Sequence, residues 1–481
     1  VRGGRAADEG RFREDVETML VNQFHDILPG TCIPEVNEKV LRQMPGIIAR
    51  FDESTARSLS GGEAESILLW NPLSFARKDP VRIRSEKMLD MPFPQQRIRD
   101  LYGEGYIAAA LPLEAFGSAA VKEGNEQAAP SAFERSGSTL VTPFARVEFA
   151  PDMTIRSFVD RRNGFELCGG ENLNTLLFGE DYPLAWDNWD IDADIELKLK
   201  NASNLIESEV VADGAVEYRI RNTYRISEHS VLRQDMVFYA ATPRVDFECE
   251  LEWGDTHRLL KVAFDTNLHA PHARSEVQFG YVLRPTTRNT TAEQEMFEAL
   301  CHKYTDLSET ERGAALLNDC KYGMTVCGGS MRLSLVKSGT HPDPSADHGV
   351  HRFRYAFLPH IGGFSAQNVV KPAYEFNQPV CTFRGGAAET QLFLADADSV
   401  IAESVKPCED TQKAYIVRLY ESANTRSKAT VSFRHPVRRA EETDMLERKI
   451  ADLPVQKKDG NTPSVELSFR PFEIKTVKIY Y

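Results

Sequence analysis

Hydrophobic residues near the start of the chain recur at the spacing of an amphipathic helix. The apolar positions of the segment 15–28 are Val16, Met19, Leu20, Phe24 and Ile27. Their spacing places them on one stripe of a helix, and Pro29-Gly30 predicts where that helix ends. On a helical wheel His25 points roughly opposite the stripe, with Asn22 and Asp26 beside it. We therefore expect a helix over 15–28 whose His25 faces away from its own apolar side.

A second helical pattern follows Pro34 and extends to about residue 58. Its apolar positions are Val36, Val40, Leu41, Met44, Ile47, Ile48 and Phe51. Pro45-Gly46 lies inside this run and is expected to kink or split the helix, because proline lacks a backbone N–H donor. Ser60-Gly61-Gly62 predicts its end. The two helices are expected to form the end of a helical bundle.

From Ser66 onward the pattern changes to short β-type runs, many with alternating apolar and polar residues, such as Val81-Arg82-Ile83-Arg84. Helical stretches are few, and 292–302 is the best of them. The predicted fold class is mainly β, a helical-bundle remnant followed by antiparallel β-sandwich domains. The expected domains are 1–58 (end of the helical bundle), 59–128 (small β-domain), 129–395 (large β-sandwich) and 396–481 (C-terminal β-sandwich). A polar segment around 124–130 is the expected linker.

Composition narrows the range of functions. The 481 residues include 42% hydrophobic ones, enough for sizeable cores, and no run approaches the length of a membrane span. The formal charge is -14, and no basic patch interrupts the sequence. This argues against a nucleic-acid partner and fits a neutral ligand such as a sugar. The eight cysteines show no Cys-x-x-Cys spacing, so we expect mostly buried, free thiols of a reducing compartment, with disulfides as the alternative.

The pair His25-Asp26 has two interpretations from the residues alone: a solvated polar face near a helix end, or a functional site. The string Asn22-Gln23-Phe24-His25-Asp26-Ile27-Leu28-Pro29-Gly30-Thr31 resembles the last zinc-binding motif of glycoside hydrolase family 38, the α-mannosidases. It is most similar to the branch with the cytosolic and bacterial enzymes. The resemblance implies that His25 is a metal ligand and that Asp26 contacts the bound mannose.

Further strings resemble the same family in the same order along the chain. They are Asp152–Asp160, Trp186–Asp192, Gly280–Pro285, Asn318–Gly323, Pro342-Asp343 with Asp347, and Arg418–Glu421. The resemblance thus extends from about residue 11 to the C-terminus. It implies a helical bundle followed by β-sandwiches, the largest of them a galactose-mutarotase-like supersandwich. This agrees with the strand pattern.

The family's site also uses an upstream His-x-Asp pair and an aspartate nucleophile, and this sequence contains neither. We therefore expect no catalytic nucleophile in this chain. We expect the site for Zn²⁺ (or another divalent cation) to be completed by an N-terminal catalytic domain, either upstream or on a separate chain. This chain alone is expected to be inactive. The resemblance implies α-mannoside glycans as substrates, retaining hydrolysis and a cytoplasmic location. No membrane partner is expected, and association with a second copy of the chain stays open.

Two other groups of residues have competing interpretations. His341, Asp343, Asp347, His348 and His351 are dense enough for a second metal, yet carboxylates between prolines also hold turns, and the family resemblance implies a structural loop there. The Trp186–Asp192 segment suits either a sugar subsite or core packing, which makes Trp186 and Asp187 candidate substrate contacts. Arg284 and Arg288 are candidates too, although arginines in such loops often pair with nearby carboxylates.

A different class of protein stays open as the alternative, namely a non-catalytic β-sandwich protein that binds carbohydrate or serves as a scaffold for a partner.

Overall fold

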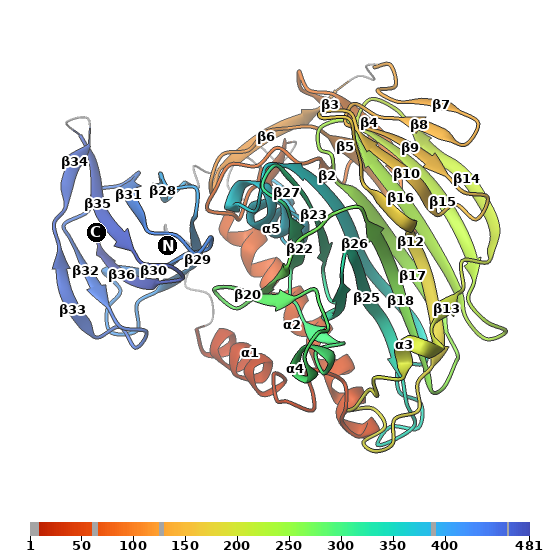
Figure 1. The fold of residues 1–481 in the computed structure, drawn as a ribbon. Coiled ribbons are helices and arrows are strands. Elements are labelled where there is room, and N and C mark those ends of the chain that lie inside the picture. The colour runs from red at the N-terminus through yellow and green to blue at the C-terminus, as the bar shows by residue number, and fades with distance from the viewer. Residues whose placement is uncertain (1–8, 60–65, 125–128, 386–390, 459–460) are drawn as a thin grey trace.

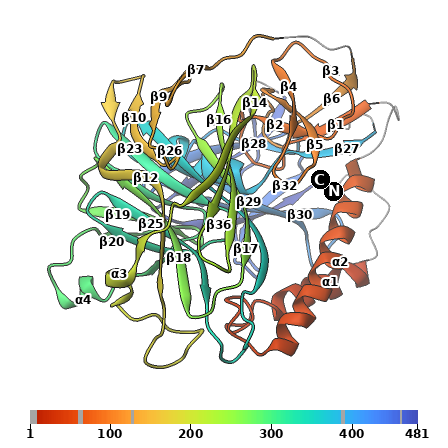
Figure 2. The same cartoon turned by 90° about the vertical axis from the view of Figure 1, so that its right-hand side faces the viewer.

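The computed structural model describes residues 9–59, 66–124, 129–385, 391–458 and 461–481. Two helices near the N-terminus lie beside a large β-sandwich, and a separate small sandwich at the C-terminus lies on their other side (Figures 1 and 2). The fold class expected from the sequence, mainly β with antiparallel sandwiches after a helical segment, is confirmed. The expected linker around 124–130 falls mostly outside the described residues.

The first helix, α1 (Glu9–Val21), ends earlier than the hydrophobic pattern predicts. Beyond it, Gln23 N–H donates to Leu20 O and Phe24 N–H to Val21 O, both at 3.1 Å, so tight turns replace the α-helical ladder. Phe24, which belongs to the apolar stripe, is exposed, so tertiary burial does not support further helix at this point. The predicted helix over 15–28 is therefore wrong beyond Val21, and His25 lies on a turn.

The second helix, α2 (Pro34–Leu59), continues through Pro45-Gly46 as one element, so the expected split is wrong. Proline removes one hydrogen bond of the ladder, and contacts with α1 hold the helix across that point. The Arg50 guanidinium binds the Asp15 carboxylate at 2.5 and 2.7 Å, and the rings of Phe12 and Phe51 lie 5.4 Å apart. Tertiary contacts thus outweigh the local signal.

The other helical elements are short, and the helix expected over 292–302 is reduced to its start. They are α3 (Ile195–Lys198), α4 (Thr291–Gln294), the π-helical turn η1 (Ala366–Val370) and α5 (Lys371–Asn377). None of the described helices combines the length and the hydrophobicity that crossing a bilayer requires.

Two small sheets follow α2 and enclose a core that includes Ile67, Ile83 and Ile107. One has the spatial order β27 (Cys381–Arg384), β1 (Ser66–Trp70), β6 (Ser118–Glu123), β3 (Leu89–Asp90), and the other β2 (Val81–Ile83), β5 (Gly105–Ala109), β4 (Gln95–Arg99). Strand β27 pairs with β1 although they are far apart in sequence. The chain therefore returns to the small sheets after it has formed the large sandwich.

The large sandwich consists of two antiparallel sheets. The first has the order β21 (Ala299–Leu300), β24 (Gly323–Cys327), β25 (Ser330–Ser338), β18 (Arg258–Thr266), β12 (Cys168–Glu180), β10 (Ile155–Asp160), β9 (Ala145–Phe149), β8 (Thr139–Val141), β7 (Glu134–Ser136), with β11 (Phe165–Glu166) on β10 and β13 (Lys200–Asn201) on β12. The second has the order β14 (Leu205–Asp213), β15 (Glu217–Arg225), β16 (Val231–Tyr239), β17 (Val245–Trp253), β26 (Gly349–Ile361), β23 (Arg312–Asn318), β22 (Tyr304–Ser308), β19 (His272–Val277), β20 (Gly280–Pro285). Aromatic rings fill the space between them. Phe264 stacks on Phe357 at 5.2 Å, and Phe247 on Tyr355 at 4.9 Å.

The C-terminal sandwich packs two sheets around Tyr415, Phe433 and Phe469. One sheet has the order β28 (Phe393–Ala395), β31 (Ser427–Phe433), β35 (Thr462–Phe469), β34 (Gln456–Lys458), and the other β29 (Val400–Pro407), β30 (Ala414–Glu421), β36 (Ile474–Tyr480), β32 (Arg439–Thr443), β33 (Lys449–Leu453). Strand β28 begins this unit a few residues before position 396.

A buried ion cluster joins the large sandwich to the small sheet that contains β5. The fully buried Arg219 guanidinium contacts the carboxylates of Glu217, Asp235 and Glu248 at 2.6–3.1 Å and donates to the Tyr106 hydroxyl at 2.8 Å. Buried charges of this kind are costly unless each has a partner. The cluster therefore holds the large sandwich and the small sheet in one relative position.

We expect Arg219→Met to lower the free energy of unfolding by about 3–5 kcal/mol, because it leaves the buried Glu217 carboxylate without its cation and leaves Asp235 and Glu248 with one arginine each, Arg221 and Arg82. Urea unfolding followed by tryptophan fluorescence measures the loss. Arg233→Met is the matched control. It removes a partly exposed pair with Glu250 on the adjacent strand and should cost less than about 1 kcal/mol. Equal losses in the two variants would contradict the role of the cluster.

A second charged group lies where α5 meets the small sheets. Arg77 forms a bidentate pair with Asp79 at 2.7 and 2.8 Å and donates to the backbone oxygen of Glu375 at 3.0 Å. Burial, assisted by the nearby Asp79 carboxylate, raises the pKa of the Glu375 carboxyl to about 8, against the pull of Arg77 and Arg244. Glu375 therefore stays protonated well above its usual range.

This raised pKa predicts the sign of a pH effect. In the unfolded chain Glu375 titrates near its ordinary pKa of about 4.3, so its contribution to stability is fully present below that pH and is lost as pH rises through the folded pKa. Between pH 5 and pH 8 we expect the urea midpoint of the wild-type protein to fall. We expect the midpoint of the Glu375→Gln variant to fall less over the same range. Parallel midpoint curves for the two proteins would show that Glu375 is not the group responsible.

Candidate functional site

The predicted metal ligand lies on the exposed turn between α1 and α2. The His25 side chain is 68% exposed, and its Nε2 lies 3.7 Å from Asp26 Oδ2. Thr31 Oγ1 donates to Asp26 Oδ1 at 3.3 Å, and Gly30 adopts a positive φ of 78° that closes the turn. The turn thus presents an imidazole and a carboxylate side by side to the outside.

The connection between β12 and α3 lies against this turn and carries two exposed tryptophans. The Trp189 ring meets the His25 ring edge-on, with 6.2 Å between centroids and an interplanar angle of 90°. Trp186 is 75% exposed and has a positive φ of 58°, an uncommon conformation for an aromatic residue. Residues far apart in sequence therefore form one surface around His25.

The candidate sugar contact Asp187 makes a dense set of internal contacts. Its Oδ2 accepts hydrogen bonds from Thr340 N–H at 2.7 Å, from Thr340 Oγ1 at 3.1 Å and from His341 N–H at 3.2 Å, and it lies 3.1 Å from His257 Nε2. These donors outweigh partial burial, which opposes them, and lower the pKa of the Asp187 carboxyl. Lys337 Nζ donates to the Asp187 carbonyl at 2.8 Å. Asp187 therefore ties three connections together.

The histidines and aspartates of 341–351 mostly contact nearby backbone. Asp343 accepts from Ser345 N–H at 2.9 Å and from Asn37 Nδ2 at 3.1 Å, which links α2 to the sandwich. His348 Nε2 lies 3.2 Å from Asp255 O, and His351 Nε2 2.6 Å from Asp347 O. In the described part of the chain these side chains do not converge as a cluster of metal ligands.

The two candidate arginines have different environments. Arg288 forms a bidentate pair with Glu196, and Glu196 raises the pKa of the Arg288 guanidinium. Arg284, on β20, donates to Leu300 O at 3.3 Å. Among the described residues no contact joins either arginine to the His25 turn.

The donor set around His25 suits part of a zinc site. Imidazole nitrogen is an ordinary zinc ligand, and the Asp26 carboxylate, with Oδ2 3.7 Å from His25 Nε2, lies beside it. A zinc site needs three or four protein ligands. Within 9–59, 66–124, 129–385, 391–458 and 461–481, no third ligand side chain joins this pair.

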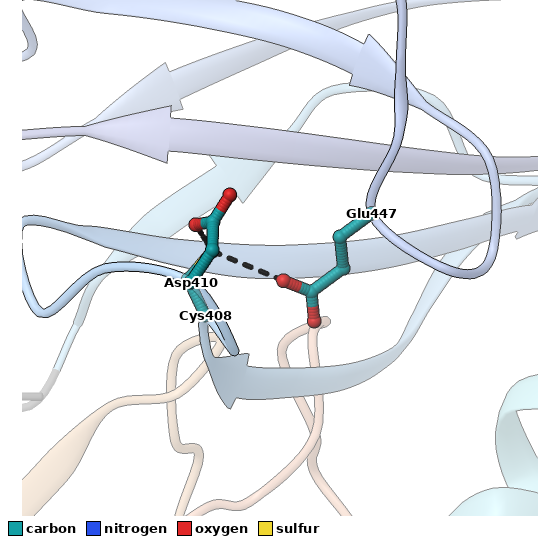
Figure 3. A group of neighbouring side chains, drawn as sticks. All are labelled: Cys408, Asp410 and Glu447. Atoms are coloured by element: carbon teal, nitrogen blue, oxygen red, sulfur yellow. Dashed lines mark hydrogen bonds between the residues drawn. The ribbon is translucent and has the colours of Figure 1, made fainter.

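One group of three ligand-type side chains occurs elsewhere, in the C-terminal sandwich. Cys408 Sγ lies 3.0 Å from both Asp410 Oδ1 and Glu447 Oε2 (Figure 3). Lysines already neutralise the carboxylates, since Lys478 Nζ lies 2.6 Å from Asp410 and Lys406 Nζ 2.5 Å from Glu447. This ion-paired group does not call for a metal.

Sequence reasoning missed the residues that organise the site. His257 and Thr340 hold Asp187, and Asn37 connects the helices to Asp343. Trp189 was noted only as part of a motif. These contacts join strand connections and a helix that are far apart in the sequence, so no local pattern signals them.

Comparisons with known proteins agree with this architecture. Residues 140–345 match the glycosyl hydrolases family 38 C-terminal domain, and residues 399–477 match the glycosyl hydrolases family 38 C-terminal beta sandwich domain. Alpha-mannosidase 2C1 of Homo sapiens is 30% identical over 95% of this chain, and the alpha-mannosidase of Saccharomyces cerevisiae is 26% identical over 97%. The chain spans less than half of these relatives, 44% and 43% of their lengths.

The fold also matches a solved structure. The crystal structure of an alpha-mannosidase from Enterococcus faecalis V583 superposes with a TM-score of 0.75 at 14% identity, covering 98% of this chain and 64% of that one. At this identity the likeness concerns the fold alone. The two matched domain models together cover more than half of the sequence. With the curated relatives, they show that this chain belongs to glycosyl hydrolase family 38 and contains the family's C-terminal domains.

Proposed function

We propose that this chain is the C-terminal portion of a zinc-dependent, retaining α-mannosidase that hydrolyses terminal α-mannosides in glycans. The observation that carries the proposal is the exposed His25-Asp26 turn, whose imidazole meets the Trp189 ring in a chain of family 38. An exposed imidazole next to a carboxylate and an aromatic ring suits both a metal and a sugar.

In this proposal His25 donates a ring nitrogen to Zn²⁺, and Asp26 accepts a hydrogen bond from a mannose hydroxyl. Bound zinc would supply positive charge that orients the sugar hydroxyls and stabilises charge in the transition state. The Thr31 hydroxyl, 3.3 Å from Asp26 Oδ1, holds that carboxylate in place. Trp186 offers an exposed ring to an apolar sugar face, and Arg284 stays a prediction as a residue that lines the pocket.

Retaining hydrolysis needs two carboxyl groups about 5–5.5 Å apart, one of them a nucleophile. We assign neither to this chain. The nucleophile and the remaining metal ligands would come from a catalytic domain outside this sequence, which is the expected partner, and this chain alone would be inactive.

The surface of the helical segment supports a covering partner. Leu20, Val21, Leu28 and Leu41 are all exposed there, and large apolar side chains exposed on one short segment support an interaction site. A catalytic domain docked on this face would complete the site around His25. It would also prevent self-association of the chain through the same face.

A reducing, cytoplasmic location fits the cysteines. All eight are free thiols in the described residues, and four of them are buried. Structural disulfides are rare in reducing compartments, so the thiols support this part of the proposal.

The first test substitutes the proposed ligand. His25→Ala in the complete protein should abolish zinc retention, measured by metal analysis after dialysis. It should lower hydrolysis of a terminal α-mannoside more than the 10–100-fold loss that is typical when outer-shell partners of a metal are mutated. Undiminished zinc content and activity would refute the role of His25.

The matched control is His269→Ala. His269 is an exposed histidine just beyond the C-terminal end of β18, at the opposite end of that strand from His257. It should leave zinc content and activity unchanged. Tight mannoside binding by this chain alone, with no contribution from zinc, would favour the non-catalytic scaffold instead.

A further inference from the structure

The loop that contacts His25 combines exposed apolar side chains with a rigid backbone. Leu184, Trp186 and Trp189 are 96%, 75% and 57% exposed. An exposed loop with such side chains would ordinarily be mobile and would bury them where it could. Here it is held in place, which suggests that the exposed rings have a function.

Asp187 is the main source of this rigidity. A single carboxylate oxygen is within hydrogen-bond distance of Thr340, His341 and His257, which belong to two other connections at the same rim of the sandwich. Charge-assisted bonds of this kind are roughly twice as strong as neutral ones. The carboxylate is thereby committed to the protein and is poorly placed to bind a sugar.

Close packing and backbone hydrogen bonds reinforce the loop and hold a strained residue within it. A Cβ on Gly339 would lie 2.2 Å from Asn188 Oδ1 and 2.8 Å from Asp187 Oδ1, so a side chain there would push the loop away. Trp186 keeps a positive φ of 58°, a conformation that L-residues rarely adopt. Trp189 N–H and Asp190 N–H both donate to Trp186 O, at 2.7 and 2.8 Å. The surrounding bonds therefore determine where Trp189 lies.

Trp189 in turn limits the freedom of His25. The imidazole has the Phe24 ring at 4.2 Å on one side and the Trp189 ring, edge-on, at 6.2 Å on another. A histidine on an exposed turn would otherwise exchange between rotamers. Two neighbouring rings that restrict it reduce the entropy lost when the nitrogen binds a ligand.

We propose that Asp187 and Trp189 are positioning residues: Asp187 clamps the Trp186–Asp190 loop, and the clamped Trp189 orients the His25 imidazole. This inference rests on the proposed function of His25 as a metal ligand. It revises the expected role of Asp187 from a sugar contact to an anchor, and it leaves Trp186 as the ring that is free to meet a substrate.

The test measures zinc affinity of the complete protein by competition with a chelator. Trp189→Ala should weaken the affinity by about 10-fold, the lower end of the range for residues that orient a metal ligand. Trp189→Phe should restore most of it, because a ring remains. Leu184→Ala is the matched control on the same loop and should have no effect. Wild-type affinity in Trp189→Ala would overturn the proposal.

A double-mutant cycle tests the order of action. Asp187→Ala should weaken zinc binding as much as Trp189→Ala does, and the double variant should lose no more than either single one, because Asp187 acts through Trp189. Additive losses would contradict this order. Circular dichroism of each variant verifies that the fold is retained.

A measurement without metal separates this proposal from the proposed function. In ¹⁵N-histidine spectra of the zinc-free protein, the His25 ring signals, identified by their loss in His25→Ala, should shift in Trp189→Ala and stay in Leu184→Ala. Unmoved signals in Trp189→Ala would overturn the positioning role. If the His25→Ala variant keeps its zinc, the proposed role of His25 as a metal ligand is refuted. The ring signals of the zinc-free protein still show whether Trp189 positions the His25 ring.

Discussion

The packing of the two large sheets around their aromatic core determines where functional loops of this protein can meet. In the first sheet Glu180 pairs with Arg258, and Arg258 pairs with Ser338. Three strand ends therefore lie side by side at one rim, and the connections that leave them are forced together. A slip of one residue in this register would turn the core-facing side chains outward, so the burial of Phe264 and its neighbours also keeps the rim in place.

Asp187 makes use of this arrangement. Asp187 lies in the connection that follows β12, His257 immediately precedes β18, and Thr340 follows β25. One carboxylate can therefore join all three connections. The same contacts hold the tryptophan loop against the turn between α1 and α2. The site around His25 is thus built from the rigid sandwich toward the helical segment, and the helices contribute only the turn itself.

The sequence predicts the larger features of this fold and misses how its parts meet. Alternation in segments such as Val81–Ile83 reflects burial on one face of a strand, which is a local property, so the β class follows from it. The helix over 15–28 fails beyond Val21 because its stripe extends past the surface that would bury it, and that surface is set by tertiary contacts. Proline at 45 fails as a break for the same reason. His25-Asp26 was found through resemblance, since periodicity alone placed it on a helix that does not exist there.

Asp187 shows why residue type alone could not assign the site. A carboxylate between two tryptophans suits a sugar hydroxyl and a loop anchor equally well, and only the positions of Thr340, His341 and His257 decide between them. All of these groups face one oxygen of Asp187, which supports an anchoring role, and in the proposed function the exposed indoles are the part of the motif that serves recognition. The strained backbone at Trp186 is tolerated because the adjacent Asp187 is anchored and the Trp186 carbonyl accepts two backbone hydrogen bonds. Rigidity of the loop and exposure of its rings therefore have a single origin in one half-buried set of hydrogen bonds.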